Sequence, residues 1–249
     1  MRWYLPDGNP LLWNELRRLL RGGRMYLFFL IEVLVLAGVL VISAGILPAQ
    51  HDAHAWSAWG EQLFLTIMGW QLGLVILFSP LLCAAAVSGE WERNSMEALW
   101  LSPVSTRSLV AGKLLGTVGY LGLMLLAGMP VLGLVAILGG IPLWWLLLGY
   151  LLTLSVGAFS AAWGLLASCN CTRTSHAVLL AYVNLGIVLA CSPTLAVPVM
   201  FVYWVSDNIV TALPVSSIVF TLMMAIGTYA VVLSCANSLN IKFDHLRLQ

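Results

Sequence analysis

Long apolar stretches dominate the chain. Five stretches lack Asp, Glu, Lys and Arg, with His taken as neutral: residues 33–51, 62–89, 114–172, 174–206 and 208–241. A transmembrane helix needs about 20 mostly apolar residues, and all five approach or exceed that length. The third stretch carries Gly139-Gly140-Ile141-Pro142 near its middle, which is typical of a turn, so it predicts two spans joined by a tight hairpin. The pattern predicts an all-α integral membrane protein with six transmembrane helices.

The expected spans are residues 25–47, 63–87, 109–138, 143–167, a fifth beginning near Ala177, and 215–239. The fifth is interrupted by Ser192-Pro193 and Pro198 before an apolar run over 199–205. Non-helical backbone at membrane depth is tolerated only where protein or a cavity covers it. We predict a fifth span that ends near Ala190, then a broken hairpin that dips into the outer leaflet. One long proline-kinked helix is the alternative.

The basic residues set the expected orientation. With six spans, all eleven fall on one face: Arg2, Arg17, Arg18, Arg21, Arg24, Arg93, Arg107, Lys113, Arg173, Lys242 and Arg247. Loops rich in Lys and Arg stay in the cytoplasm. The sequence therefore predicts a multi-pass protein of the inner (cytoplasmic) membrane with both termini in the cytoplasm.

Composition excludes several classes of protein. Hydrophobic residues make up 61% of the chain and charged residues 8%, against about 25% charged in an average soluble domain, so a water-soluble fold is excluded. The net charge of +1 gives no basic field for nucleic acid. The five cysteines fall in spans or in a predicted cytoplasmic turn, so no disulfide framework and no metal site are expected. His51, Asp52 and His54 have metal-binding chemistry, but a solvated outer loop explains them more simply.

Residues 1–24 predict a cytoplasmic amphipathic helix before the first span. Asn9-Pro10 is a helix-start signal and Gly22-Gly23 can end the helix. Leucines then share one face while polar and basic residues occupy the other, which is typical of a helix lying on the membrane surface. It either anchors the first span or also contacts a cytoplasmic partner.

The most informative segment is residues 89–103, on the expected cytoplasmic side between the second and third spans. Arg93 and Glu97 are spaced to pair across one helical turn, and Ser102-Pro103 must end the helix. Apolar residues share a face inside a charged rim, as in a small docking surface. The pattern alone leaves docking and a solvated surface helix equally open. The residues concerned are Glu90, Glu92, Arg93, Met96, Glu97, Leu99 and Trp100.

Residues 89–113 closely resemble the cytoplasmic loop of ABC-2 type transporter permeases, which typically reads GE-x-E-x-G-T/S-x-E-x-L-x-x-T/S-P-x-S and later GK. The matching residues are Gly89, Glu90, Glu92, Ser95, Glu97, Leu99, Ser102, Pro103, Ser105, Gly112 and Lys113. Residues 9–18 also resemble the NP-x-x-x-x-E-L-R opening of these permeases. Asn94 replaces the usual Gly, and Trp91 stands where a basic residue is common.

The resemblance implies the permease subunit of an ATP-driven exporter. In this family the helix at about residues 90–101 is the coupling helix, which seats in a separate ATPase, and the N-terminal helix with Glu15, Arg17 and Arg18 braces that contact. ATP and Mg would bind the partner, because no G-x-x-x-x-G-K-[ST] loop occurs in this chain. The chain is then not an enzyme and needs no cofactor. The family's arrangement implies two permease copies, with the substrate path at their interface.

Polar residues inside the spans have two interpretations. Gln71, Asn184 and Ser192 line the path if the resemblance carries over, but helix-to-helix hydrogen bonds explain them equally well. Glu32 lies near the inner edge of the first span, so we expect it to snorkel or to pair with Arg24. A non-transporting permease-like subunit of a motility or assembly complex is the alternative function, and substrate identity stays open.

Overall fold

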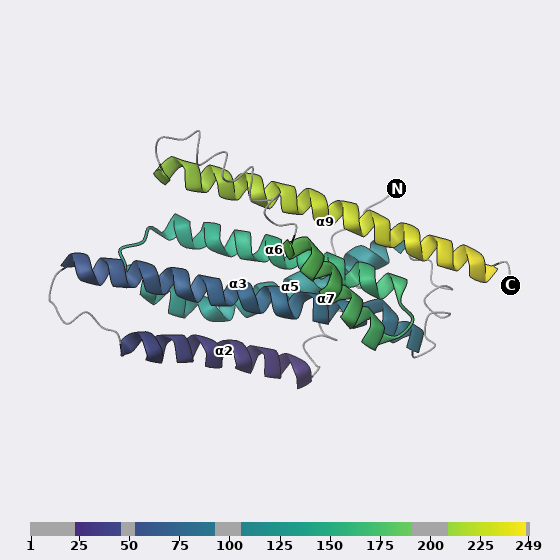
Figure 1. Cartoon of the computed structure of the whole chain (residues 1–249), viewed down its shortest axis with the longest axis horizontal. Coiled ribbons are helices and arrows are strands. Elements are labelled where there is room, and N and C mark those ends of the chain that lie inside the picture. Colours follow the sequence, from purple (N-terminus) through teal and green to yellow (C-terminus); the bar gives the residue numbers. More distant parts are fainter. Residues whose placement is uncertain (1–22, 46–52, 93–105, 191–208, 248–249) are drawn as a thin grey trace, which may run out of the picture.

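The computed structural model describes residues 23–45, 53–92, 106–190 and 209–247 (Figure 1). The described residues form helices and short connections, without a strand. The helices are α2 (Gly23–Ala44), α3 (Ala53–Glu92), α5 (Thr106–Leu138), α6 (Leu143–Asn170), α7 (Thr174–Ala190) and α9 (Ile209–Arg247). The all-α prediction is confirmed.

Five of these helices, all but α7, are long and apolar enough to cross a membrane. Helix α7 has 17 described residues and is not among the five, so the six-span arrangement stays a prediction. The expected N-terminal amphipathic helix, up to residue 22, and the broken hairpin after Ala190 lie outside the described residues.

Several helices extend beyond the expected spans. Helix α3 starts at Ala53 rather than at residue 63, and it ends at Glu92 rather than at residue 87. Helix α9 continues to Arg247, past the predicted end at residue 239. Hydropathy marks only the part of a helix that suits lipid, whereas backbone hydrogen bonding continues into the polar turns beyond it.

The predicted turn between α5 and α6 is confirmed. The amide of Ile141 donates to Ala136 O at 2.8 Å and that of Gly140 to Ile137 O at 3.2 Å, the two bonds of a Schellman motif. Gly140 has φ +64°, which costs a residue without a Cβ little. The sequence Gly-Gly-Ile-Pro thus ends α5, reverses the chain and starts α6 within four residues.

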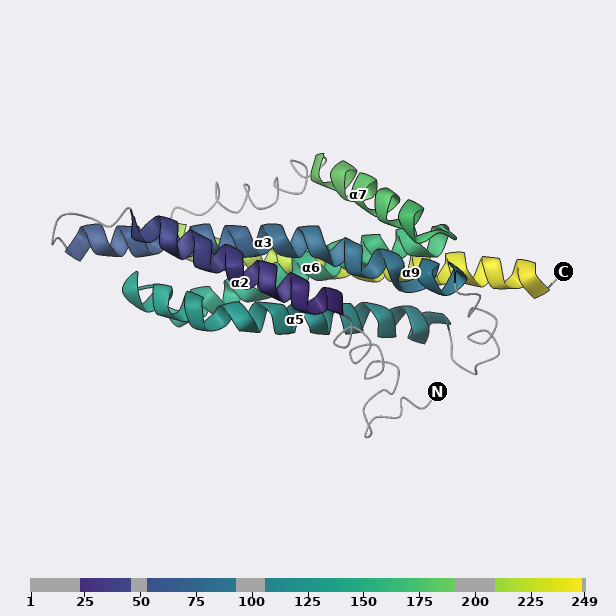
Figure 2. The same ribbon diagram turned by 90° about the horizontal axis from the view of Figure 1, so that it is seen from below.

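Helices α3 and α6 make the most extensive contact in the bundle, and α2 and α9 lie on opposite sides of it (Figure 1). One apolar cluster, which includes Val87, Val110, Leu165 and Leu239, joins α3, α5, α6 and α9. A second, which includes Leu36, Ile67, Leu132 and Leu146, joins α2 to α3, α5 and α6. Seen from below, α7 leaves the bundle at an angle to the other helices (Figure 2).

The helices alternate in direction, so α3, α6 and α9 end where α5 and α7 begin (Figure 1). We call this end the basic end, because Arg107, Lys113, Arg173 and Lys242 lie there. At the opposite end, Trp144 and Trp145 stack with ring centroids 4.7 Å apart, and Trp56 meets Trp59 at 6.0 Å. This separation of Trp clusters from basic residues is typical of the two edges of a membrane protein.

The sequence predicted no disulfide framework, and the described residues contain a single disulfide. The structure joins Cys169 of α6 to Cys235 of α9, with Cα atoms 6.1 Å apart. The two residues lie 66 positions apart in sequence and meet because α6 and α9 pack along each other. Cys83 and Cys171 are outside this disulfide, and the Cys83 thiol donates to Thr117 Oγ1 at 3.2 Å.

Candidate functional site

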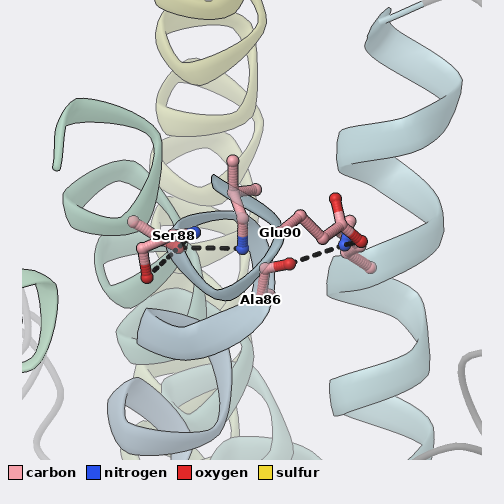
Figure 3. A network of polar contacts seen from close by, with 6 residues as sticks. Ala86, Ser88 and Glu90 are labelled. Carbon is pink, nitrogen blue, oxygen red and sulfur yellow. Dashed lines mark hydrogen bonds and ion pairs between the residues drawn. The ribbon is translucent and has the colours of Figure 1, made fainter. Parts of the chain in front are cut away.

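The last turn of α3 is held by a buried ion pair at the basic end. Lys113 of α5 donates from Nζ to Glu90 Oε1 at 2.5 Å and to Ala86 O at 2.6 Å (Figure 3). The Lys113 side chain is 3% exposed and that of Glu90 is 14% exposed. A charge this deeply buried is stable only with a partner, so the pair fixes α3 and α5 relative to each other.

Helix α6 binds the same part of α3 through a serine hydroxyl. The backbone amides of Val87 and Ser88 both donate to Ser168 Oγ, each at 2.9 Å (Figure 3). The Ser88 hydroxyl donates to Ala84 O at 2.7 Å. Ser88 and Ser168 are fully buried, so these bonds form away from lipid and water.

Helix α9 reaches the same turn through Lys242. Its Nζ donates to Cys169 O, near the C-terminus of α6, at 2.6 Å. The same ammonium lies 5.8 Å from the centre of the Trp91 ring, a cation–π distance. A cation at a helix C-terminus also interacts favourably with the helix dipole. Lys242 therefore joins α9 to both α6 and α3.

The carboxylate of Glu92 on α3 caps the N-terminus of helix α7. The Thr174 amide donates to Glu92 Oε1 at 2.7 Å, and the Thr174 hydroxyl donates to the same oxygen at 2.9 Å. A helix N-terminus leaves its first amides without helical partners, and an acidic oxygen there satisfies one of them. Here the acid comes from another helix, so the end of α3 and the start of α7 are joined.

The start of α5 is also tied to α9. The Thr106 hydroxyl donates to Asn240 Oδ1 at 2.7 Å. Residues 93–105 connect Glu92 to Thr106, so both flanks of this segment are bonded to the bundle. We call these contacts the basic-end clamp. It comprises Ser88, Glu90, Trp91, Glu92 and Thr106 with their partners Ser168, Lys113, Lys242, Thr174 and Asn240.

The residues expected to dock a partner divide into two groups. Glu90 and Glu92, which we expected at the start of a separate short helix, form the last turn of α3 and bind Lys113 and Thr174. The others lie outside the described residues: Glu15, Arg17, Arg18, Arg93, Met96, Glu97, Leu99 and Trp100.

Two of the three residues expected along a substrate path lie in the described part of the chain. Gln71 is 1% exposed on α3 and donates to Glu32 Oε1 at 3.4 Å, the helix-to-helix bond that was its alternative interpretation. Asn184 is half-buried on α7, and Ser192 lies outside the described residues. Of the possible metal ligands, His51 and the side chain of His54 are also outside them.

Sequence reasoning missed the partners in the clamp. Lys113 counted as an orienting charge and as a match to the family motif but was given no partner, and Thr174 and Lys242 drew no functional interpretation. One signal was present: Gly89-Glu90 and Gly112-Lys113 place opposite charges at the ends of two neighbouring helices. Two such charges at membrane depth favour pairing, because each alone would be costly.

A helical bundle with apolar outer faces and polar contacts concentrated at one end defines a multi-pass membrane protein. A family model described as "ABC-2 family transporter protein" matches residues 10–201, which are 192 of the 249 residues. The chain belongs to this family and is a membrane permease component of an ABC-type transporter. A search of curated proteins finds no match.

Proposed function

We propose that the chain is the permease subunit of an ATP-driven ABC-2 type exporter whose separate ATPase docks on residues 93–105. In this arrangement Arg93, Met96, Glu97, Leu99 and Trp100 contact the ATPase. ATP and Mg bind that partner, and Glu15, Arg17 and Arg18 brace the contact. Glu90 and Glu92 have a different role, which is to hold the flanks of the docking segment to the helices.

One observation carries this proposal: both flanks of the docking segment are bonded to the bundle. Glu92 holds α7, Glu90 holds α5 and Thr106 holds α9, while Ser168 of α6 binds α3 one turn earlier. A push on residues 93–105 would therefore reach α3, α5, α7 and α9 directly. Switching by rigid-body movement requires such a connection between the site of ATP hydrolysis and the spans.

The substrate path would lie between two permease copies. Large apolar side chains are exposed on the outer faces of the described helices, among them Leu34, Leu134, Ile137 and Leu151. Such faces suit lipid or a second copy. The basic end is cytoplasmic in this proposal, because Lys and Arg accumulate on the inner side of membrane proteins. Asn184 and Ser192 would line that path, whereas Gln71 is buried against Glu32 inside a single copy.

Docking is tested by purifying the complex from its native membrane in mild detergent. We expect an ATPase at about one copy per permease, since each permease presents one docking segment. Glu97→Lys should remove the ATPase without affecting insertion, because it reverses a charge at the proposed contact. Glu61→Lys is the matched control, because Glu61 is exposed near the opposite end of α3. An ATPase that remains bound to Glu97→Lys at wild-type stoichiometry would refute the docking site.

Transport is tested in proteoliposomes that contain the purified complex. ATP-dependent movement of any lipid, glycan, peptide or drug probe out of the compartment that holds the ATPase supports an exporter. Movement into that compartment would refute the direction. ATP hydrolysis without movement of any probe would instead support a non-transporting subunit of a motility or assembly complex.

A further inference from the structure

Glu32 is buried inside the bundle instead of pointing toward the membrane edge. It is 2% exposed on α2, and its Oε1 accepts a bond of 3.4 Å from Gln71 Nε2 on α3. The expectation that Glu32 snorkels to the membrane edge was wrong, while the side chain of Arg24, the other expected partner, lies outside the described part of the chain. The helical position of Glu32 faces α3 and α5, so the side chain enters the protein and not the interface.

The Glu32–Gln71 pair lies deep in the bundle. A Cβ built on Gly128 of α5 would stand 2.1 Å from Gln71 Nε2 and 3.3 Å from Leu36 Cδ1, so α5 leaves space for the pair there. Gly128 is fifteen residues from Lys113 (128 − 113) and ten from Leu138, which ends α5. At a rise of 1.5 Å per residue these separations are about 22 Å and about 15 Å.

Two buried oxygen atoms of the pair, Glu32 Oε2 and Gln71 Oε1, lack a hydrogen-bond partner. Tyr150 of α6 packs against two apolar clusters, one of which includes Ile67 and the other Val75. Ile67 and Val75 lie one helical turn before and after Gln71. The carboxyl and amide thus face an apolar surround with a tyrosine hydroxyl beside them.

No described cation faces this site. The described Asp, Glu, Lys and Arg side chains of the helices packed on α2 are Glu61, Glu90 and Glu92 on α3, with Arg107 and Lys113 on α5. All of them lie toward the helix ends. Helix α6, which brings Tyr150, carries no charged residue, and Tyr120 of α5 is the other titratable group nearby. An ionised Glu32 would therefore be a buried charge without a counter-charge, which costs several kcal/mol.

A single proton on Glu32 would remove the uncompensated charge and also supply the missing hydrogen bond. A carboxylic acid offers one donor and one acceptor, and a primary amide offers the complementary set. Gln71 already donates to Oε1, so a proton on Glu32 Oε2 would give that oxygen a donor and Gln71 Oε1 the acceptor role it lacks. We propose that Glu32 and Gln71 form an intramembrane proton-binding site that holds α2 against α3 and α5.

The site also has a mechanical consequence. Of the described helices, α3 and α5 make the main contacts with α2. Ionisation of Glu32 would place an unpaired charge in that contact, so loss of the proton loosens α2. Because the folded chain would hold a proton that an exposed glutamic acid releases above about pH 4.3, its stability falls as pH rises above that value.

Infrared spectroscopy of the purified full chain tests the proton directly. At pH 7 we expect the carbonyl band of one protonated carboxylic acid, which Glu32→Gln removes and the exposed control Glu61→Gln retains. The absence of this band from the wild-type chain, or its persistence in Glu32→Gln, would overturn the proposal. The wild-type spectrum alone decides the first point, even if Glu32→Gln fails to insert.

Thermal unfolding across pH supplies a second readout. The wild-type chain and Glu61→Gln should lose stability as pH rises, by up to about tenfold in the folding equilibrium constant per pH unit. Glu32→Gln should lack this component, since its amide cannot ionise. Sodium or potassium titrated at fixed pH should have no effect specific to Glu32. Stabilisation of the wild-type chain but not of Glu32→Gln by either ion would show that a metal cation occupies the site, and the proton proposal would be wrong.

Discussion

Replacing Lys113 by methionine is the sharpest perturbation of the basic-end clamp. It removes a side chain that is 3% exposed and bonds to both Glu90 Oε1 and Ala86 O. Breaking a buried ion pair by removing one partner costs about 3–5 kcal/mol. For a chain of this size, each kcal/mol lost from the free energy of unfolding lowers the midpoint temperature by about 2–4 °C. We therefore expect the midpoint of thermal unfolding in detergent to fall by about 6–20 °C.

The double variant Lys113→Met with Glu90→Met tests whether the lost stability comes from leaving one buried charge without its partner. Replacing both partners of a buried pair by apolar residues is often neutral, so the double variant should recover most of the lost midpoint. Arg107→Met is the control, because Arg107 is exposed on the same helix and should change stability by no more than about 0.5 kcal/mol. A single Lys113 variant as stable as this control, or a double variant less stable than either single one, would refute the assignment of the pair as a structural tie.

Two further substitutions test other ties. Ser168→Ala leaves the amides of Val87 and Ser88 without their acceptor on α6 and should cost about 1–3 kcal/mol in the same unfolding assay, while an unchanged midpoint would mean that these bonds contribute nothing net. Gly140→Ala forces a Cβ onto a residue with φ +64° and should cost about 1–2 kcal/mol. Gly122→Ala, where a Cβ meets no atom within 4 Å, should not destabilise the chain, and equal losses at both glycines would contradict the turn argument.

Hydropathy predicted the helices well because lipid imposes a strong length requirement. The end of α5 at Leu138 and the start of α6 at Leu143 agree with the sequence, since Gly and Pro there restrict the backbone itself. The true start of α3 was not predictable in the same way. Residues 53–62 include polar and charged side chains that suit water, and nothing in hydropathy separates a polar helical turn from a loop.

The contacts of the clamp could not be predicted because they depend on packing. Lys113 was assigned by charge to an aqueous edge, yet the close approach of α3 and α5 buries it beside Glu90. Glu32 was misjudged for the same reason, since its depth was counted along α2 alone and not against α3 and α5. The sequence shows a polar residue within its own helix, whereas the side chain that it bonds comes from another helix.

At the end opposite the clamp, α3 touches the turn between α5 and α6 backbone to backbone. A Cβ built on Gly60 would lie 2.5 Å from Gly139 Cα. The two backbone segments therefore cannot slide past each other there without separating. A second contact of this kind lies further along α3, where a Cβ built on Gly164 of α6 would stand 2.7 Å from Pro80 Cα. Pro80 also removes a hydrogen bond inside α3 and favours a bend there. The 12 residues from Pro80 to Glu92 (92 − 80), about 18 Å of helix, therefore form the part of α3 that would follow the clamp while the rest stays against its neighbours.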